Sequence, residues 1–585
     1  MKSYRSLWPY LHRYRWRFFF GFLFVLATNY VNVQIPGIVG MTINSMTGHS
    51  DLLGDLAVIG VYIVALAGIS GAFRYLMRRV LIDTSRDIEF DFRNDIYAHL
   101  QRLDPTYYDQ NSTGDIMSRM TNDIDLVRMM LGPAIMYTAN SIVVLPLVLY
   151  KMAAMDWRMT AAGLAPLLLL PPLVKAFGSR LHSRSREQQD SMADLTTFVQ
   201  ESLAGIRIIK AYGRENDSAK RFLDENETYI DKSLSVARVQ AAFFPSIRLL
   251  TGMGMLAILF VGAWHIINET SDFGTLMALI MLYGMIIWPL IAAGWVINLY
   301  QRGSAGIDRI NEILQAEPRI SDSPQVVAPE DLPDTLDIAF NNLTFTYDGA
   351  GNPALRNITL DVPAGRTLGI VGRVGSGKST LVHLLLRLYP VERGTITLGG
   401  IDLNDWPLDE LRRAVGIVYQ DTFLFSDSIA ENIRFGALGD LDDEQIVQAA
   451  TAADVHKDIK DFPKGYDTML GERGINLSGG QKQRLSIARS LVRNARILIL
   501  DDCLSAVDTH TEEAILGALR SVMAGRTTFL ISHRISTVAL ADEIIVLEDG
   551  AITQRGTHEQ LVAQPGLYAD LHRKQLLEEE VEGIV

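Results

Sequence analysis

Cysteine is almost missing from this sequence of 585 residues, in which Cys503 is the single example. One thiol cannot form a disulfide within the chain, so a disulfide framework is excluded and a reducing compartment is favoured. Excess positive charge is missing as well, because 67 acidic residues outnumber 54 Lys and Arg residues. The net charge of −13 argues against a nucleic-acid partner held through phosphate contacts.

The first residues lack the pattern of a cleavable signal peptide, because the basic start runs into an apolar stretch that is too long and has no small-residue cleavage site. Six apolar stretches instead approach or reach the length that spans a bilayer. A large soluble helical domain is the alternative, but short polar gaps between so many apolar runs favour a membrane domain. The predicted spans are residues 18–42, 56–80, 131–153, 159–179, 247–269 and 274–297.

Basic residues are distributed unevenly among the gaps between these spans. The gaps at 44–55 and 265–273 contain no Lys or Arg, whereas the long gaps at 81–130 and 180–246 are rich in Arg. The positive-inside rule therefore places both termini and both long gaps in the cytoplasm. We expect these gaps to continue the helices beyond the bilayer and to pass motion between the spans and a cytoplasmic domain.

Ionisable residues are few inside the predicted spans, and no chain of buried acids and bases is apparent, which counts against a proton-driven pump. The last span contains Met277, Met281 and Met285, four residues apart and therefore on one helix face. Methionine adapts to varied apolar partners, so this stripe fits either a promiscuous cavity or ordinary helix packing.

A nine-residue segment in the second half, Gly372–Thr380, matches the phosphate-binding loop pattern G-x-x-x-x-G-K-[ST]. An apolar strand pattern precedes it and an apolar run of helical length follows, which is the context that the motif requires. Its backbone N–H groups and the helix N-terminus would bind phosphate oxygens. Lys378 would reach the β- and γ-phosphates and Ser379 would hold Mg²⁺, whereas a chance glycine turn would do neither.

Other polar residues occur where strands or turns end. Tyr347, which lies 25 residues before Gly372, could stack on adenine or could be an ordinary strand tyrosine. Ser478–Gln481 opens a predicted helix, so it is either a second anion site or a simple helix cap. The remaining candidates end apolar strands: Gln420 for Mg²⁺ or the attacking water, Asp501 for Mg²⁺ with Asp502 next to it, and His533 for a γ-phosphate.

In their order along the chain, these motifs resemble those of ATP-binding cassette exporters, specifically half-transporters with the membrane domain first. The similarity includes LSGGQ at 477–481 and Ser505–Asp508. In the membrane half, Thr113–Asp123 and Gly205–Tyr212 are similar to the two intracellular coupling regions of such exporters, and 285–289 and 301–305 are similar to bacterial multidrug exporter subunits.

The resemblance implies a dimer in which each ATP lies between the phosphate loop of one chain and the Ser478–Gln481 turn of the other. Asp502 stands where the family usually has Glu, and it is shorter by roughly 1.5 Å. A misplacement of about 1 Å can slow a reaction on the order of 100-fold. The chain thus resembles the degenerate subunit of heterodimeric exporters, and its partner would be a different half-transporter with Glu after the Walker B Asp.

The sequence therefore predicts an α-helical transmembrane domain with six spanning helices (1–316), a Pro-containing surface linker (317–334) and an α/β P-loop nucleotide-binding domain (335–585). The predicted function is ATP-driven export of lipophilic or amphipathic compounds across the bacterial cytoplasmic membrane, with membrane lipids around the protein. A lipid or peptide flippase and an ATP-gated regulatory or channel subunit are the alternatives. A soluble ATPase of DNA repair or translation is excluded by the spans and the acidic charge.

The predicted site residues fall into three groups that bind ATP and Mg²⁺ or act on the water. Catalytic roles are assigned to Asp502, His533 and Gln420, and Mg²⁺ contacts to Ser379, Gln420 and Asp501. Nucleotide contacts are assigned to Tyr347, Gly372, Arg373, Val374, Gly375, Ser376, Gly377, Lys378, Ser379, Thr380, Ser478, Gly479, Gly480 and Gln481.

Overall fold

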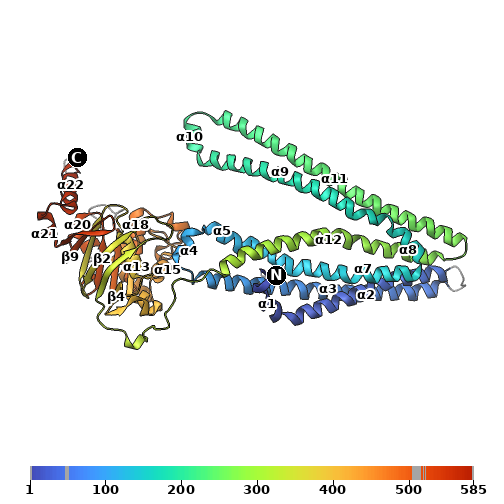
Figure 1. The fold of residues 1–585 in the computed structure, drawn as a ribbon, viewed down its shortest axis with the longest axis horizontal. Helices are drawn as coiled ribbons and strands as arrows, with labels where there is room; N and C mark the ends of the chain where they lie inside the picture. The colour runs from blue at the N-terminus through green and yellow to red at the C-terminus, as the bar shows by residue number, and fades with distance from the viewer. Residues whose placement is uncertain (1–2, 47–51, 504–514, 518–519, 521, 583–585) are drawn as a thin grey trace. The chain divides into compact units, whose positions relative to one another are not determined.

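The computed structural model describes residues 3–46, 52–503, 515–517, 520 and 522–582 (Figure 1). The chain divides into two compact units, one of Met1–His99 with Gly114–Gln315 and one of Leu100–Thr113 with Ala316–Val585. The short segment Leu100–Thr113 therefore groups with the second unit, although the helices before and after it belong to the first.

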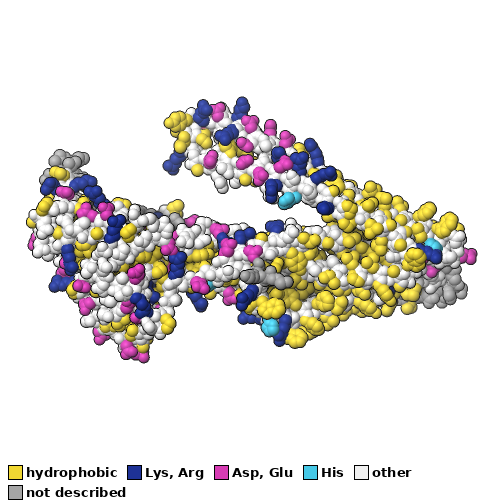
Figure 2. All heavy atoms as spheres, viewed as in Figure 1, with side chains coloured by type: hydrophobic (Ala, Val, Ile, Leu, Met, Phe, Trp, Pro, Cys, Tyr) yellow, Lys and Arg dark blue, Asp and Glu magenta, His cyan; other side chains and the backbone are white. Residues whose placement is uncertain are grey.

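Long helices build the first unit because its apolar runs satisfy their backbone hydrogen bonds internally. Among the described residues, six helical stretches are long and apolar enough to cross a membrane, which confirms the predicted number of spans. Hydrophobic side chains cover much of the surface of these helices (Figure 2). The stretches are Arg15–Ser45, Ala57–Leu100, Thr113–Met155, Trp157–Ala204, Glu215–Ile267 and Phe273–Leu314.

The helices of the first unit continue well past spanning length. The longest are α2 (Arg15–Ser45), α3 (Leu52–Leu100), α7 (Ile135–Met155), α9 (Leu170–Ala204), α11 (Glu215–Ile267) and α12 (Phe273–Leu314), with α8 (Trp157–Leu164) before α9. Shorter helices include α1 (Trp8–Arg13), α5 (Thr113–Ser118), α6 (Ile124–Met129) and α10 (Ile206–Ala211).

The helical continuations are braced by polar contacts. Glu187 of α9 accepts hydrogen bonds from Arg184 and from Lys232 of α11, each at 3.1 Å. Asp123 is buried and pairs with Arg309 of α12, whose Nε lies 2.8 Å from Oδ2. These contacts link neighbouring helices of the first unit to one another.

The second unit is an α/β domain with two sheets. The six-stranded sheet has the order β10-β9-β3-β8-β7-β6, and β3 pairs in parallel with both β8 and β9. Its strands are β3 (Thr367–Gly372), β6 (Val415–Val418), β7 (Ile497–Asp501), β8 (Thr527–Ile531), β9 (Glu543–Glu548) and β10 (Ala551–Gly556). Because parallel strands share one carboxyl edge, the residues that follow β3, β6, β7 and β8 are brought together.

A smaller antiparallel sheet, in the order β2-β1-β4-β5, consists of β1 (Ile338–Phe345), β2 (Leu355–Val362), β4 (Ile396–Leu398) and β5 (Ile401–Asp402). The helices of this unit include α4 (Pro105–Gln110), α13 (Lys378–Leu385), α14 (Leu408–Ala414), α15 (Ile429–Arg434), α16 (Asp443–Ala452), α17 (His456–Asp461), α18 (Gly479–Leu491), α20 (Ile535–Val538), α21 (His558–Ala563) and α22 (Leu567–Glu582). The predicted fold class, six spanning helices followed by an α/β domain, is confirmed.

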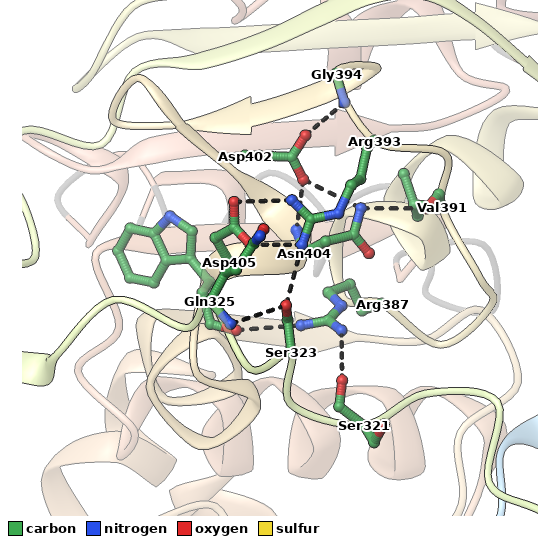
Figure 3. A network of polar contacts seen from close by, with 11 residues as sticks. Ser321, Ser323, Gln325, Arg387, Val391, Arg393, Gly394, Asp402, Asn404 and Asp405 are labelled. Carbon is green, nitrogen blue, oxygen red and sulfur yellow. Dashed lines mark hydrogen bonds and ion pairs between the residues drawn. The ribbon is translucent and has the colours of Figure 1, made fainter.

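The Pro-containing segment after the first unit is held in place by two arginines (Figure 3). Buried Arg387 donates to the carbonyl oxygens of Ser321 at 3.0 Å and of Trp406 at 3.1 Å. Arg393 donates to the Ser323 hydroxyl at 3.0 Å and pairs with Asp405 at 2.8 Å. These contacts bind this part of the segment to the second unit.

Candidate functional site

A cavity of about 980 Å³ opens at the carboxyl edge of the parallel sheet. Its lining includes every predicted residue of the phosphate loop from Gly372 to Thr380, together with Tyr347, Gln420, Asp501, Asp502 and His533. Strand topology thus gathers side chains that are far apart in the sequence. Ser478, Gly479, Gly480 and Gln481 do not line this cavity.

The phosphate loop has a backbone that requires glycine at two positions. Gly375 and Gly377 have φ values of 82° and 96°, which L side chains rarely adopt. At Gly377, a Cβ atom would also approach the Ala354 carbonyl oxygen to 2.5 Å. Helix α13 begins directly after this glycine, so the N–H groups of its first turn point into the cavity.

Two side chains of the loop fit a polyanionic ligand. Ser376 Oγ is buried and has no hydrogen-bond partner among the described residues. Lys378 Nζ donates to the carbonyl oxygens of Gly372 at 2.9 Å and Arg373 at 2.8 Å, so its ammonium group lies over the loop. Burial lowers the pKa of Lys378, and the charges of Asp502 and Asp501 oppose that effect.

Asp501, the last residue of β7, is 3% exposed, and its carboxylate accepts a hydrogen bond from the Ser379 hydroxyl. Burial raises the pKa of Asp501, whereas the Ser379 hydrogen bond lowers it. The two oxygens form a pair that suits Mg²⁺, which usually takes one or two protein ligands and completes its shell with phosphate and water.

Asp502 is held on both sides by its predicted catalytic partners. Gln420 Nε2 donates to one carboxylate oxygen at 3.2 Å, and His533 Nδ1 lies 2.8 Å from the other. The backbone of Asp502 has a φ of 47°, and its N–H donates to the Ile531 carbonyl at 2.8 Å. The hydrogen bond that the His533 ring makes to the Asp502 carboxylate raises the pKa of His533, and the partial burial of the ring opposes this shift.

Tyr347 lies at the margin of the cavity, with its hydroxyl 3.0 Å from that of Thr380. Its ring packs edge-to-face against Tyr389 at a centroid distance of 5.0 Å. Tyr389 in turn donates from its hydroxyl to Asp109 of α4 at 3.2 Å. Burial and the charge of Asp109 raise the pKa of Tyr389.

Three residues in these contacts escaped sequence reasoning. Tyr389 and Asp109 are 280 positions apart, so no local pattern links them. Gln575 of α22 accepts from the Ile535 N–H at 2.7 Å and donates to the His533 carbonyl at 3.0 Å. The Gln575 amide therefore holds the segment that carries His533 through two hydrogen bonds. Only the tertiary fold brings α22 close to the site.

The predicted second anion site is a helix cap in this structure. Ser478 Oγ accepts from the Gln481 N–H at 3.2 Å, and Gln481 Oε1 accepts from the Ser478 N–H at 3.0 Å, which forms a capping box at the start of α18. Such a cap presents further N–H groups at the helix N-terminus. The predicted motif Ser505–Asp508 lies outside the described residues.

Two family models match successive parts of the chain. Residues 18–290 match the model of the ABC transporter transmembrane region, and residues 355–505 match the model of the ABC transporter. A solved structure of a bacterial Atm1-family ABC exporter with ATP bound is similar, with a TM-score of 0.77 and 26% identity over 96% of this chain and 98% of that one.

Relatives are similar over nearly the whole chain. The multidrug resistance-like ATP-binding protein MdlA of Escherichia coli is 38% identical, over 99% of this chain and 97% of the relative. The probable multidrug resistance ABC transporter protein YheI of Bacillus subtilis is 37% identical over 97% and 96%, and an ATP-dependent lipid A-core flippase of Syntrophus aciditrophicus is 37% identical over 90% and 86%. The chain therefore belongs to the ATP-binding cassette transporter family, with the architecture of an exporter half-transporter.

Proposed function

We propose that the protein is one half of a heterodimeric exporter that uses ATP to move lipophilic or amphipathic compounds outward across a bacterial cytoplasmic membrane. The observation that carries this proposal is the cavity that joins the phosphate loop, Asp501, Asp502, Gln420 and His533, in a chain with six candidate spans. Both termini and the second unit would lie in the cytoplasm, in agreement with the distribution of Arg among the gaps.

Each side chain of the cavity has a distinct task in this proposal. Lys378 and the loop N–H groups bind the β- and γ-phosphates, and Tyr347 stacks on adenine. Ser379, Asp501 and Gln420 hold Mg²⁺, which supplies charge compensation at the phosphates when bound. His533, whose pKa is raised by Asp502, contacts the γ-phosphate.

Asp502 makes this chain's own site the slow one. Its carboxylate already bonds to Gln420 and His533, and it is one methylene shorter than Glu, so it stops short of a water in line with the γ-phosphate. Ser478–Gln481 would complete the competent site, which lies on the phosphate loop of a different partner chain.

Multidrug export is favoured by the names of the relatives, YheI and MdlA. Lipid flipping is the second candidate, because lipid A-core flippases are also similar over most of the chain. Both functions use the same ATP site and differ in the compound that the membrane helices bind.

Transport in inside-out vesicles that contain this chain and its partner tests the proposal. We expect ATP-dependent accumulation of a lipophilic dye against its gradient, and no accumulation with a non-hydrolysable ATP analogue. If ATP only changes the rate of passive equilibration, the protein is a gated subunit and the proposal is wrong. Stimulation of ATPase activity by lipid A, but not by drugs, would select the flippase.

A further inference from the structure

The first unit contains a cavity of about 310 Å³ that no sequence motif indicates. It lies between α2, α3, α7 and α12 and is lined by residues of these helices alone. Polar residues form one part of its wall: Thr28, Asn29 and Asn32 of α2, Arg74 and Arg78 of α3, and Asn140 of α7. In the described part of the chain, no Asp or Glu lines it.

Arg74 and Arg78 are the charged residues of this wall, and they lie four residues apart on one face of α3. Within the described residues, neither has a hydrogen bond or an ion pair with an acidic side chain, whereas the neighbouring Arg79 pairs with Asp83 at 3.7 Å. Two like charges at this spacing repel each other. An anion between them would relieve that repulsion.

The depth of Arg74 adds to this argument. In the predicted span 56–80, Arg74 is six residues from the middle, or about 9 Å along a helix. The hydrocarbon core extends about 15 Å on each side of its midplane. Burying a charged arginine at this depth costs free energy unless the side chain faces a protein cavity or a ligand. An arginine here therefore indicates a functional site more often than a contact with lipid headgroups.

Helices α2 and α7 add polar side chains to this wall. Thr28 is 3% exposed and its hydroxyl has no partner among the described residues. Thr42 on the same helix shows the usual arrangement, because its hydroxyl donates to the Ile38 carbonyl at 2.8 Å. Asn29 is positioned by a 3.0 Å hydrogen bond to Asn140.

Apolar side chains complete the cavity. Trp288 and Met285 of α12 line it together with Met77 of α3 and Met136 of α7. Of the predicted methionine stripe, Met285 lines this cavity, Met277 packs in an apolar core and Met281 is exposed. An indole and several thioethers suit an aromatic or alkyl group of variable shape.

We propose that this cavity binds an amphiphilic anion, with its acidic group between Arg74, Arg78 and the Thr28 hydroxyl and its apolar body against Trp288 and Met285. The acidic group is a carboxylate, sulfonate or phosphate ester, all of which guanidinium groups bind in bidentate fashion. This inference rests on the proposed exporter function and narrows its substrate class from lipophilic compounds in general to anions.

Equilibrium binding without nucleotide tests the inference separately from transport. The full chain with its partner, in nanodiscs of zwitterionic lipid, is titrated with pyrenebutanoate and with a pyrenebutyl trimethylammonium ion, which share an aromatic body and differ in charge. We expect the anion to bind, and Arg74→Gln and Arg78→Gln each to weaken it roughly tenfold or more. Arg74→Lys should restore part of the affinity, and Arg79→Gln, the matched control outside the cavity, should have no effect.

Two results would overturn the inference: equal binding of the cation and the anion, or equal anion binding by wild type and the Arg74 and Arg78 variants. A second arm identifies the source of the anion. Competition with the pyrenebutanoate probe by phosphatidic acid in the nanodisc points to a lipid, and competition only by a soluble, non-fluorescent arylalkanoate points to an aqueous compound. If the protein binds the anion but the same preparation shows no ATP-driven transport, the exporter proposal is wrong and the inferred anion site still stands.

Discussion

Lys378 places an ammonium group over the phosphate loop, where it bonds to two backbone carbonyls. Replacing it by Ala removes the charge that the phosphates would meet, while the loop glycines keep their backbone. We expect Lys378→Ala to weaken nucleotide binding at this chain's site by about tenfold to a hundredfold, in line with the strength of charged hydrogen bonds.

Photolabelling with azido-ATP measures this change chain by chain. Lys464→Ala, an exposed lysine of the same unit, serves as the control and should label normally. Normal labelling of the Lys378→Ala chain would mean that the phosphate loop has been assigned to the wrong segment.

His533 should make ATP binding depend on pH. Asp502 raises the pKa of this imidazole, so the cationic form persists to higher pH than for an ordinary histidine. ATP affinity should therefore be constant at low pH and fall as the pH rises through the raised pKa. In Asp502→Asn the carboxylate charge is gone, so the fall should move to lower pH.

ATP and ADP titrations between pH 5.5 and about 8.5, which bracket the ordinary histidine pKa of about 6.5, measure this shift. ADP lacks the γ-phosphate and is the control, since its affinity should change less. Identical ATP profiles for wild type and Asp502→Asn would exclude the ion pair as the cause.

Helix α4, which groups with the second unit, accepts a hydrogen bond from the adenine side of the site. Tyr389 packs on Tyr347 and donates to Asp109, so a change in the position of Tyr347 is passed to α4. Tyr389→Phe keeps the ring and removes the hydroxyl. We expect normal nucleotide binding and a loss of roughly half or more of the substrate-stimulated ATPase activity, because a neutral-to-charged hydrogen bond contributes about 1.5–3 kcal/mol.

Comparison of basal and substrate-stimulated ATPase rates measures this effect. Tyr466→Phe is the matched control, because that hydroxyl lies 2.7 Å from His456 and not near α4. The double variant Tyr389→Phe/Asp109→Asn should be no worse than either single variant. Additive losses would show that the two side chains act independently.

At the scale of the whole transporter, the helical extensions should meet the nucleotide-binding domains. The resemblance assigns the two coupling regions to Thr113–Asp123 and Gly205–Tyr212, and the segment Leu100–Thr113, which groups with the second unit, ends where the first of them begins. Ile208 and Tyr212, at the tip between α9 and α11, are 66% and 77% exposed, as expected of side chains that pack against another surface.

Cysteine pairs test this contact. One member replaces Ile208 or Tyr212 and the other replaces a residue near Gln420, in a Cys503→Ser background. Crosslinks between chains should form and should change in yield with nucleotide. Pairs that start from Leu223, which is exposed farther along α11, are the control, and uniform failure of the tip pairs would leave these loops as plain helical extensions.

The proposed asymmetry of two ATP sites belongs to the assembly rather than to one chain. Expressed alone, the chain should have little ATPase activity. With its partner, Asp502→Ala should keep much of the turnover, whereas Ser478→Ala should reduce it severely, because Ser478 would serve the competent site of the partner. Brisk ATPase activity of the chain alone, abolished by Asp502→Ala, would show a homodimer in which Asp502 is a working base.

Local patterns in the sequence were sufficient for the order of the two units, the number of spans and the positions of the phosphate loop and the strand-end carboxylates. The reason is that helix periodicity, apolar run length and glycine-rich turns are properties of neighbouring residues. The capping box at Ser478 belongs to the same class, since its two partners are three positions apart.

Only the tertiary structure decided which distant side chains share a contact. The bonds between Gln420 and Asp502, Tyr389 and Asp109, and Asn29 and Asn140 join residues 82, 280 and 111 positions apart. The cavity around Arg74 likewise needs four helices, and the sequence alone does not show which residues lie near that arginine. Strand order and helix packing bring such groups together, because burial of the apolar faces selects one arrangement of elements whose neighbours no local pattern specifies.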